Sequence, residues 1–84
     1  MEERVDRPAH YRGKKYDVID IIEEFDLNFS RGNVVKYSLR AGRKDEAGYS
    51  DLAKELEDLK KGAWYLNREI ERIQNLIDNE AKAV

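Results

Sequence analysis

The apolar residues of the C-terminal third follow a spacing that restricts the fold of the whole chain. They are separated by 4, 3, 4, 3, 4, 3 and 4 positions, at Leu52, Leu56, Leu59, Ala63, Leu66, Ile70, Ile73 and Ile77. This heptad pattern, which continues for nearly four repeats, predicts one long helix over residues 50–80 with a single apolar seam. About 28 residues at about 1.5 Å each extend roughly 42 Å, which is more than two short helices cover.

We therefore expect part of this seam to meet a second copy of the chain. A single core built from so few residues seldom supplies more than about 3–5 kcal/mol, which also favours homo-oligomerisation. A self-contained three-helix bundle is the alternative. Gly62 has no side chain and Ala63 a small one, so another helix or a ligand can come close to the backbone of the helix at this point.

Two shorter helices are predicted before the long one. Apolar residues spaced at i, i+3, i+4 and i+7 predict a helix over 16–27. Asn28 or Ser30 as N-cap and Gly42 after the last turn delimit a second helix over 29–42. Ser50 or Asp51 caps the long helix. The prediction is a single all-α domain over 1–84, with an N-terminal arm (1–15), a loop (43–49) and a tail (81–84).

The composition excludes several classes of protein. With no cysteine and one histidine, the chain forms neither a disulfide framework nor a His-rich zinc site of its own. It contains no apolar run of about 18 residues, and its first residues lack an apolar stretch, so we expect no membrane span and no secretory signal. The net charge of −2 argues against binding a DNA or RNA polymer.

The positive charges are nevertheless concentrated in one segment. Residues 31–44 contain five basic side chains and no acidic one, namely Arg31, Lys36, Arg40, Arg43 and Lys44. A local cationic site on a weakly acidic protein suits a small anionic ligand better than a long polyanion.

Four polar residues of the second predicted helix share one face. Asn33, Lys36, Tyr37 and Arg40 stand at i, i+3, i+4 and i+7. Lys and Arg bind phosphate, Asn pairs with a base edge and Tyr stacks on a base, so the stripe matches the parts of a nucleotide. The alternative is a solvated polar stripe with Tyr37 half-buried. We expect the opposite stripe to pack inward: Val34, Val35, Ser38, Leu39 and Ala41.

Three aromatic or imidazole side chains outside that helix are further candidates. His10 and Tyr11 lie on the N-terminal arm, where they either pack or join the ligand site. Trp64 falls off the heptad seam, so it either covers one of the short helices or stacks on a ligand. Arg43 and Lys44 would add cations next to Arg40.

Motifs of catalysis are absent. The chain has neither a phosphate-binding loop nor a dinucleotide-binding glycine motif, and His10 has no convincing Ser-His-Asp partners. Glu55 and Asp58 could bind magnesium with two acids of the first predicted helix, Glu23 and Asp26. A solvated acidic face is the alternative, and we predict no resident metal.

Three blocks of the chain carry a family resemblance: Pro8-Ala9-His10-Tyr11, Gly32-Asn33-Val34-Val35-Lys36-Tyr37-Ser38-Leu39-Arg40-Ala41-Gly42, and Trp64-Tyr65-Leu66. In this order they resemble a family of small tailed-phage proteins that is catalogued as a domain of unknown function. Its members are also labelled nucleotide-kinase-like or SaV-like. Arg7 stands where the family usually has a first histidine.

The resemblance implies a nucleotide on the basic stripe of the second helix. Similar small oligomeric phage proteins trap nucleotide second messengers made by bacterial antiphage defences. This predicts a homo-oligomer that sequesters a cyclic di- or trinucleotide in the cytoplasm of the infected host, without catalysis and without a cofactor.

Three other functions stay open. A larger relative is a nucleoside monophosphate kinase without a phosphate-binding loop, and a kinase would require Mg²⁺. The long helix could instead block a host protein. A magnesium-dependent nucleotide pyrophosphatase would use the acids named above.

Overall fold

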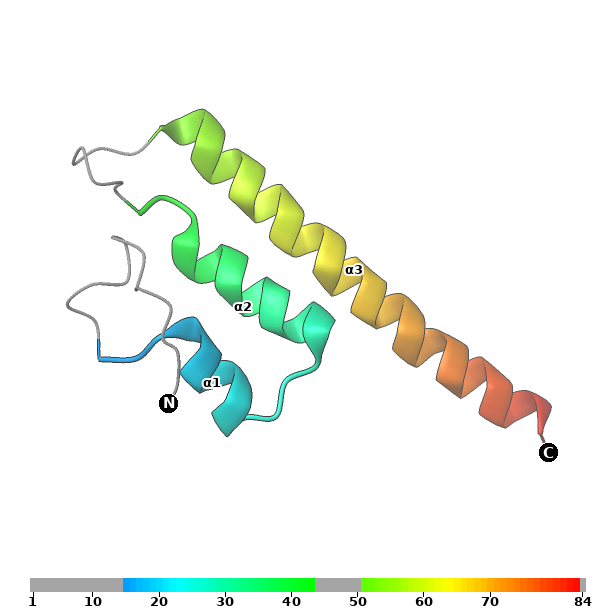
Figure 1. Cartoon of the computed structure of the whole chain (residues 1–84). Coiled ribbons are helices and arrows are strands. Elements are labelled where there is room, and N and C mark those ends of the chain that lie inside the picture. Colours follow the sequence, from blue (N-terminus) through cyan, green and yellow to red (C-terminus); the bar gives the residue numbers. More distant parts are fainter. Residues whose placement is uncertain (1–14, 44–50, 84) are drawn as a thin grey trace.

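The computed structural model describes residues 15–43 and 51–83, and within these ranges the chain is all-helical. Its elements are α1 (Val18–Glu24), α2 (Phe29–Arg40) and α3 (Leu52–Lys82), with α2 placed between α1 and α3 (Figure 1). The predicted fold class, two short helices followed by a long C-terminal helix, is confirmed. No helix in the described ranges is both long and apolar enough to cross a membrane.

Local capping explains where the helices begin and end. The Asn28 side chain accepts a hydrogen bond from the Arg31 amide at 2.8 Å, which starts α2. Asp51 accepts from the Ala53 amide at 3.0 Å and starts α3. After α2 the chain turns at Gly42, whose φ of +77° is the left-handed conformation that glycine adopts without strain.

Helices α2 and α3 run antiparallel and meet along a polar face. Arg31, near the start of α2, reaches Glu69, whereas Arg40 at its end reaches Asp58. The α3 residues of this face are also spaced by 4, 3, 4 and 3 positions: Asp58, Gly62, Tyr65, Glu69 and Arg72. A Cβ at Gly62 would lie 3.5 Å from the Tyr37 Cβ. The close approach predicted at Gly62 is therefore made by α2.

The apolar heptad seam therefore lies on the outside of the single chain. Its residues are all exposed, from 36% for Ile73 to 80% for Leu52. Among the described residues, Val18 is the only buried apolar side chain. Because α2 packs on the polar face of α3, it leaves the seam uncovered, and pairing of the seam with a second copy stays a prediction.

Candidate functional site

Aromatic rings form the centre of the contact between α2 and α3. The Tyr37 ring of α2 stacks on Tyr65 of α3, with centroids 6.1 Å apart and planes 14° apart. Phe29, at the start of α2, meets the same Tyr65 edge-on at 5.7 Å. These contacts hold Tyr37 half-buried and fix the position of the side chains around it.

Three cations surround the Tyr37 ring. The Lys36 Nζ lies 4.5 Å from the ring centroid, the Arg40 guanidinium carbon 5.6 Å and the Lys61 Nζ 5.7 Å. Each distance lies within the range of a cation–π interaction, which places positive charge over the electron-rich face of the ring. Lys61 comes from α3, so two helices contribute to one positively charged site.

Acidic groups balance only part of this charge. Asp58 pairs with Arg40, with 3.5 Å between Oδ2 and Nε, and Glu57 pairs with Lys61 at 3.9 Å. Within the described ranges, Lys36 has no ion-pair partner, and neither does Lys60, which directly precedes Lys61 on α3. We call the set Lys36, Tyr37, Arg40, Lys60, Lys61 and Trp64 the cationic patch. Its four cations against these two acids leave an excess of two positive charges.

A shallow groove of about 450 Å³ opens along one side of α3. It is lined by Ala53, Leu56, Glu57, Lys60, Lys61 and Trp64. The Trp64 indole is 60% exposed and meets Tyr65 of its own helix edge-on at 5.0 Å. Since Lys61 both lines the groove and lies over Tyr37, the groove and the cations form one continuous surface.

The structure corrects two predictions about α2. Asn33 is buried and its amide donates to the Phe29 carbonyl at 2.9 Å, so its side chain is already engaged within the helix and is not presented to a base. The opposite stripe does not pack inward as predicted, since Ser38 and Leu39 are exposed and Val34, Val35 and Ala41 are only partly buried. The stripe predicted to face solvent is the one that faces α3.

The position predicted for Trp64 is also wrong in one respect. The Trp64 side chain is largely exposed rather than covering a short helix, and its ring contacts the neighbouring Tyr65 edge-on. Of the other candidates, Arg43 is exposed just after Gly42 and lies outside the cationic patch. His10, Tyr11 and Lys44 lie outside the described residues.

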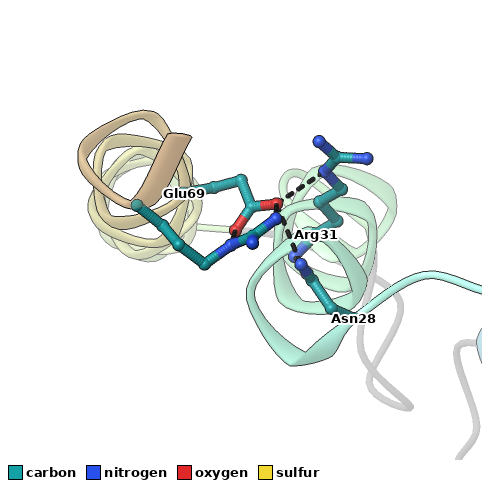
Figure 2. Close-up of polar contacts among 4 residues, drawn as sticks. Asn28, Arg31 and Glu69 are labelled. Atoms are coloured by element: carbon teal, nitrogen blue, oxygen red, sulfur yellow. Dashed lines mark hydrogen bonds and ion pairs between the residues drawn. The ribbon is translucent and has the colours of Figure 1, made fainter. Parts of the chain in front are cut away.

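A second polar cluster, which the sequence patterns did not reveal, holds the opposite end of the interface. The Glu69 carboxylate reaches from α3 between Asn28 and Arg31 of α2 (Figure 2). Its Oε2 accepts from the Asn28 amide at 2.8 Å and lies 2.8 Å from Arg31 Nε. Arg72, one turn further along α3, donates to both carboxylate oxygens at 3.0 and 2.9 Å. The only sequence signal was that Glu69 follows Asp58 and Gly62 at heptad-like intervals.

These donors change the titration of the cluster. Hydrogen bonds from Arg72 and Asn28 lower the pKa of Glu69 from its ordinary value of 4.5 to about 2, against the opposing effect of burial. The same carboxylate raises the pKa of Arg72. Glu69 therefore stays ionised under all ordinary conditions and acts as a structural clamp between α2 and α3.

Two of the acids predicted as magnesium ligands, Asp58 and Glu55, lie against other groups of the chain. The described residues contain no group of three or more His, Asp or Glu side chains that could hold an ion. Asp58, one of the proposed magnesium ligands, pairs with Arg40 instead, and the carboxylate of Glu55 lies against the backbone of Gly42.

Comparison with protein families places this site in context. A family model described as a protein of unknown function, DUF3310, matches residues 5–67, which is three quarters of the chain. The chain belongs to the DUF3310 family. The matched range includes the whole cationic patch and Asp58, whereas Glu69 and Arg72 lie beyond its end. No curated protein and no solved structure matches the chain.

Proposed function

We propose that this DUF3310 protein binds a nucleotide at the cationic patch and sequesters it without converting it. The observation that carries the proposal is the crowding of Lys36, Arg40 and Lys61 around one aromatic ring. Like charges repel one another, so such a cluster is most stable when an anion occupies it. A phosphate group supplies that anion, and Arg and Lys are its usual partners in proteins.

The neighbouring groove suits the rest of a nucleotide. Two cations and an aromatic ring line it together, Lys60, Lys61 and Trp64. The exposed Trp64 offers an aromatic surface on which a base stacks, a contact worth about 1–3 kcal/mol per base. Phosphate near Lys36 and Lys61 and a base against Trp64 would use both parts of the patch.

The proposed ligand is a cyclic di- or trinucleotide that serves as an immune signal of a bacterial host, and the proposed location is the cytoplasm of that host during phage infection. This part rests on the family resemblance given above. Sequestration requires only tight binding and abundant protein, so the proposal needs neither a catalytic group nor a cofactor. The proposed partners are this ligand and further copies of the chain, and they include no nucleic-acid polymer and no membrane.

The experiment is a retention assay with analysis of the products. The purified protein is incubated with Mg²⁺, ATP and a panel of nucleoside monophosphates and cyclic di- and trinucleotides, then desalted and heat-denatured. Chromatography of the released material should return one or more cyclic nucleotides intact. Phosphorylated or cleaved products would overturn sequestration in favour of the kinase or the pyrophosphatase. Retention of no nucleotide would overturn nucleotide binding altogether.

A further inference from the structure

The outer face of α3 carries the strongest unexplained feature of the described chain. Eight apolar positions repeat along 26 residues of one helix, and each is exposed. One flank of this seam is already occupied by α2. The last turns of α3 extend beyond α2 and carry Ile73, Leu76 and Ile77 with no described segment against them (Figure 1). A monomer rarely exposes an apolar stripe of this length.

We propose that this seam pairs with the same seam of a second copy in antiparallel orientation. The spacing of 4, 3, 4, 3, 4, 3 and 4 reads the same in both directions, so all eight positions align about a two-fold axis between residues 64 and 65. The numbers of any two residues that face each other across the pair then add up to 129. Leu52 faces Ile77, Leu56 faces Ile73, Leu59 faces Ile70 and Ala63 faces Leu66.

The choice of side chains favours the antiparallel orientation. Apart from Ala63, the first half of the seam is leucine and the last three positions are isoleucine, so antiparallel pairing gives three equal Leu–Ile layers on each side of the axis. Parallel pairing would place Ala63 against Ala63 and leave a gap in the middle of the seam, where close packing is needed. Antiparallel helices also set their macrodipoles in opposition.

Pairing in this way brings the Lys60 and Trp64 side chains of the two cationic patches to one face of the dimer. On α3, one flank of the seam is held by α2, through residues such as Gly62 and Glu69, and the other flank carries Lys60 and Trp64. Antiparallel pairing turns equivalent flanks to the same side of the dimer. Both Trp64 side chains then lie beside the two-fold axis, on one face with both copies of Lys60.

The ligand site is therefore shared by the two copies, an extension that rests on the proposed function. A ligand with two phosphates and two bases related by two-fold symmetry matches such a surface. Each copy would supply one Trp64 and one Lys60 to the shared face, and one ligand would bind per dimer. The orientation of the helices is tested without any ligand, so the two claims fail separately.

The orientation is measured by spin-label distances. The chain has no cysteine, so Ala53→Cys gives a single labelled position on the unoccupied flank. In the antiparallel pair residue 53 lies opposite position 76 of the other copy, an offset of 23 residues or about 35 Å along the helix. We expect a label–label distance of that order by double electron–electron resonance. A distance below about 20 Å, the sum of a helix diameter and the label arms, indicates a parallel pair and overturns the proposal. Absence of dipolar coupling overturns it as well.

A matched pair of variants tests the seam itself. Leu59→Glu places a charge in the seam, and Leu39→Glu places the same charge on α2, at residues that are 49% and 44% exposed. In analytical ultracentrifugation at one fixed protein concentration, the wild type and Leu39→Glu should sediment as dimers. Leu59→Glu should sediment as a monomer, with half the mass. Equal masses for the two variants contradict a seam interface. Circular dichroism checks that Leu59→Glu remains helical.

The shared site is tested by stoichiometry. Trp64 is the only tryptophan, so its fluorescence reports binding directly. Titration with cyclic di-GMP, or with the cyclic nucleotide that the retention assay returns, should saturate at one ligand per two chains. Saturation at one ligand per chain overturns the shared site while leaving the antiparallel pair intact. Failure of every nucleotide to bind overturns the proposed function and the shared site together, and again leaves the helix orientation to the distance measurement.

Discussion

Asp58 of α3 and Arg40 of α2 form an ion pair whose two members are unequally buried. The Asp58 side chain is 3% exposed and its Oδ1 has no hydrogen-bond partner, whereas the Arg40 side chain is 32% exposed. Their single close contact, between Oδ2 and Nε, measures 3.5 Å. Because water reaches the guanidinium but not the carboxylate, the acid depends on this pair far more than the base does.

This asymmetry predicts unequal costs for removing the two partners. Arg40→Gln leaves a buried carboxylate without its counter-charge and should lower the free energy of unfolding by about 3 kcal/mol. Asp58→Asn leaves a partly solvated arginine and should cost only about 1 kcal/mol. Urea denaturation at one fixed protein concentration measures both values.

The double variant Arg40→Gln/Asp58→Asn provides the internal control. It should be more stable than Arg40→Gln alone, since it removes the unpaired charge as well. If the two single variants lost equal free energies of unfolding, or if the loss in the double variant were the sum of the two, the buried carboxylate would not depend on Arg40.

The pH dependence of stability follows from Glu69. Its pKa is lowered in the folded protein, so its stabilising effect is complete above the ordinary value of 4.5 and is lost as the pH falls toward about 2. The difference in urea midpoint between the wild type and Glu69→Gln should therefore shrink between pH 4.5 and 2. Glu71→Gln, on the exposed side of the same turn, is the control and should show a much smaller change. A difference that stays constant across this range would contradict the clamp.

Replacing Gly62 tests how closely α2 approaches α3. A Cβ at this position would lie 3.5 Å from the Tyr37 Cβ, which is ordinary van der Waals contact. Gly62→Ala should thus fit and stabilise the helix by about 0.5–1 kcal/mol, because glycine is a poor helix former. Gly62→Leu should overfill the contact and cost about 1–3 kcal/mol. Thermal unfolding of both variants measures this, and similar behaviour of the two would mean that the helices do not meet at Gly62.

Much of the fold could be predicted because its signals are local. Asn28, Asp51 and Gly42 act on backbone groups within a few residues, so their capping roles follow from their types and positions. The heptad spacing likewise predicts the length of α3. These features do not depend on which helix packs against which.

The orientation of the helices could not be predicted in the same way. The heptad pattern predicts that part of the apolar seam meets a second copy, but it does not tell which face of α3 the short helices use. Helix α2 packs on Asp58, Gly62, Tyr65 and Glu69. Polar contacts of this kind have no periodic signature that separates them from a solvated face. For the same reason the engagement of the Asn33 amide and the role of Glu69 became visible only in three dimensions.

The candidate site was anticipated in part. Lys36, Tyr37 and Arg40 do lie together, because residues at i, i+1 and i+4 of a helix can all reach one ring. Lys61 was not foreseen, since its approach to Tyr37 depends on the register between α2 and α3. Trp64 belongs to the patch because it lies one turn after Lys60 on the exposed flank of α3.

The central claim is that the cationic patch binds nucleotide phosphate, and affinity measurements on lysine variants test it most directly. Isothermal titration with a nucleotide retained by the wild type would compare Lys36→Gln and Lys61→Gln with Lys54→Gln, an exposed lysine of α3 outside the patch. A hydrogen bond to a charged group contributes about 1.5–3 kcal/mol, so each patch variant should weaken binding at least about tenfold. Lys54→Gln should bind as the wild type does. Equal affinities for all three variants would contradict the account.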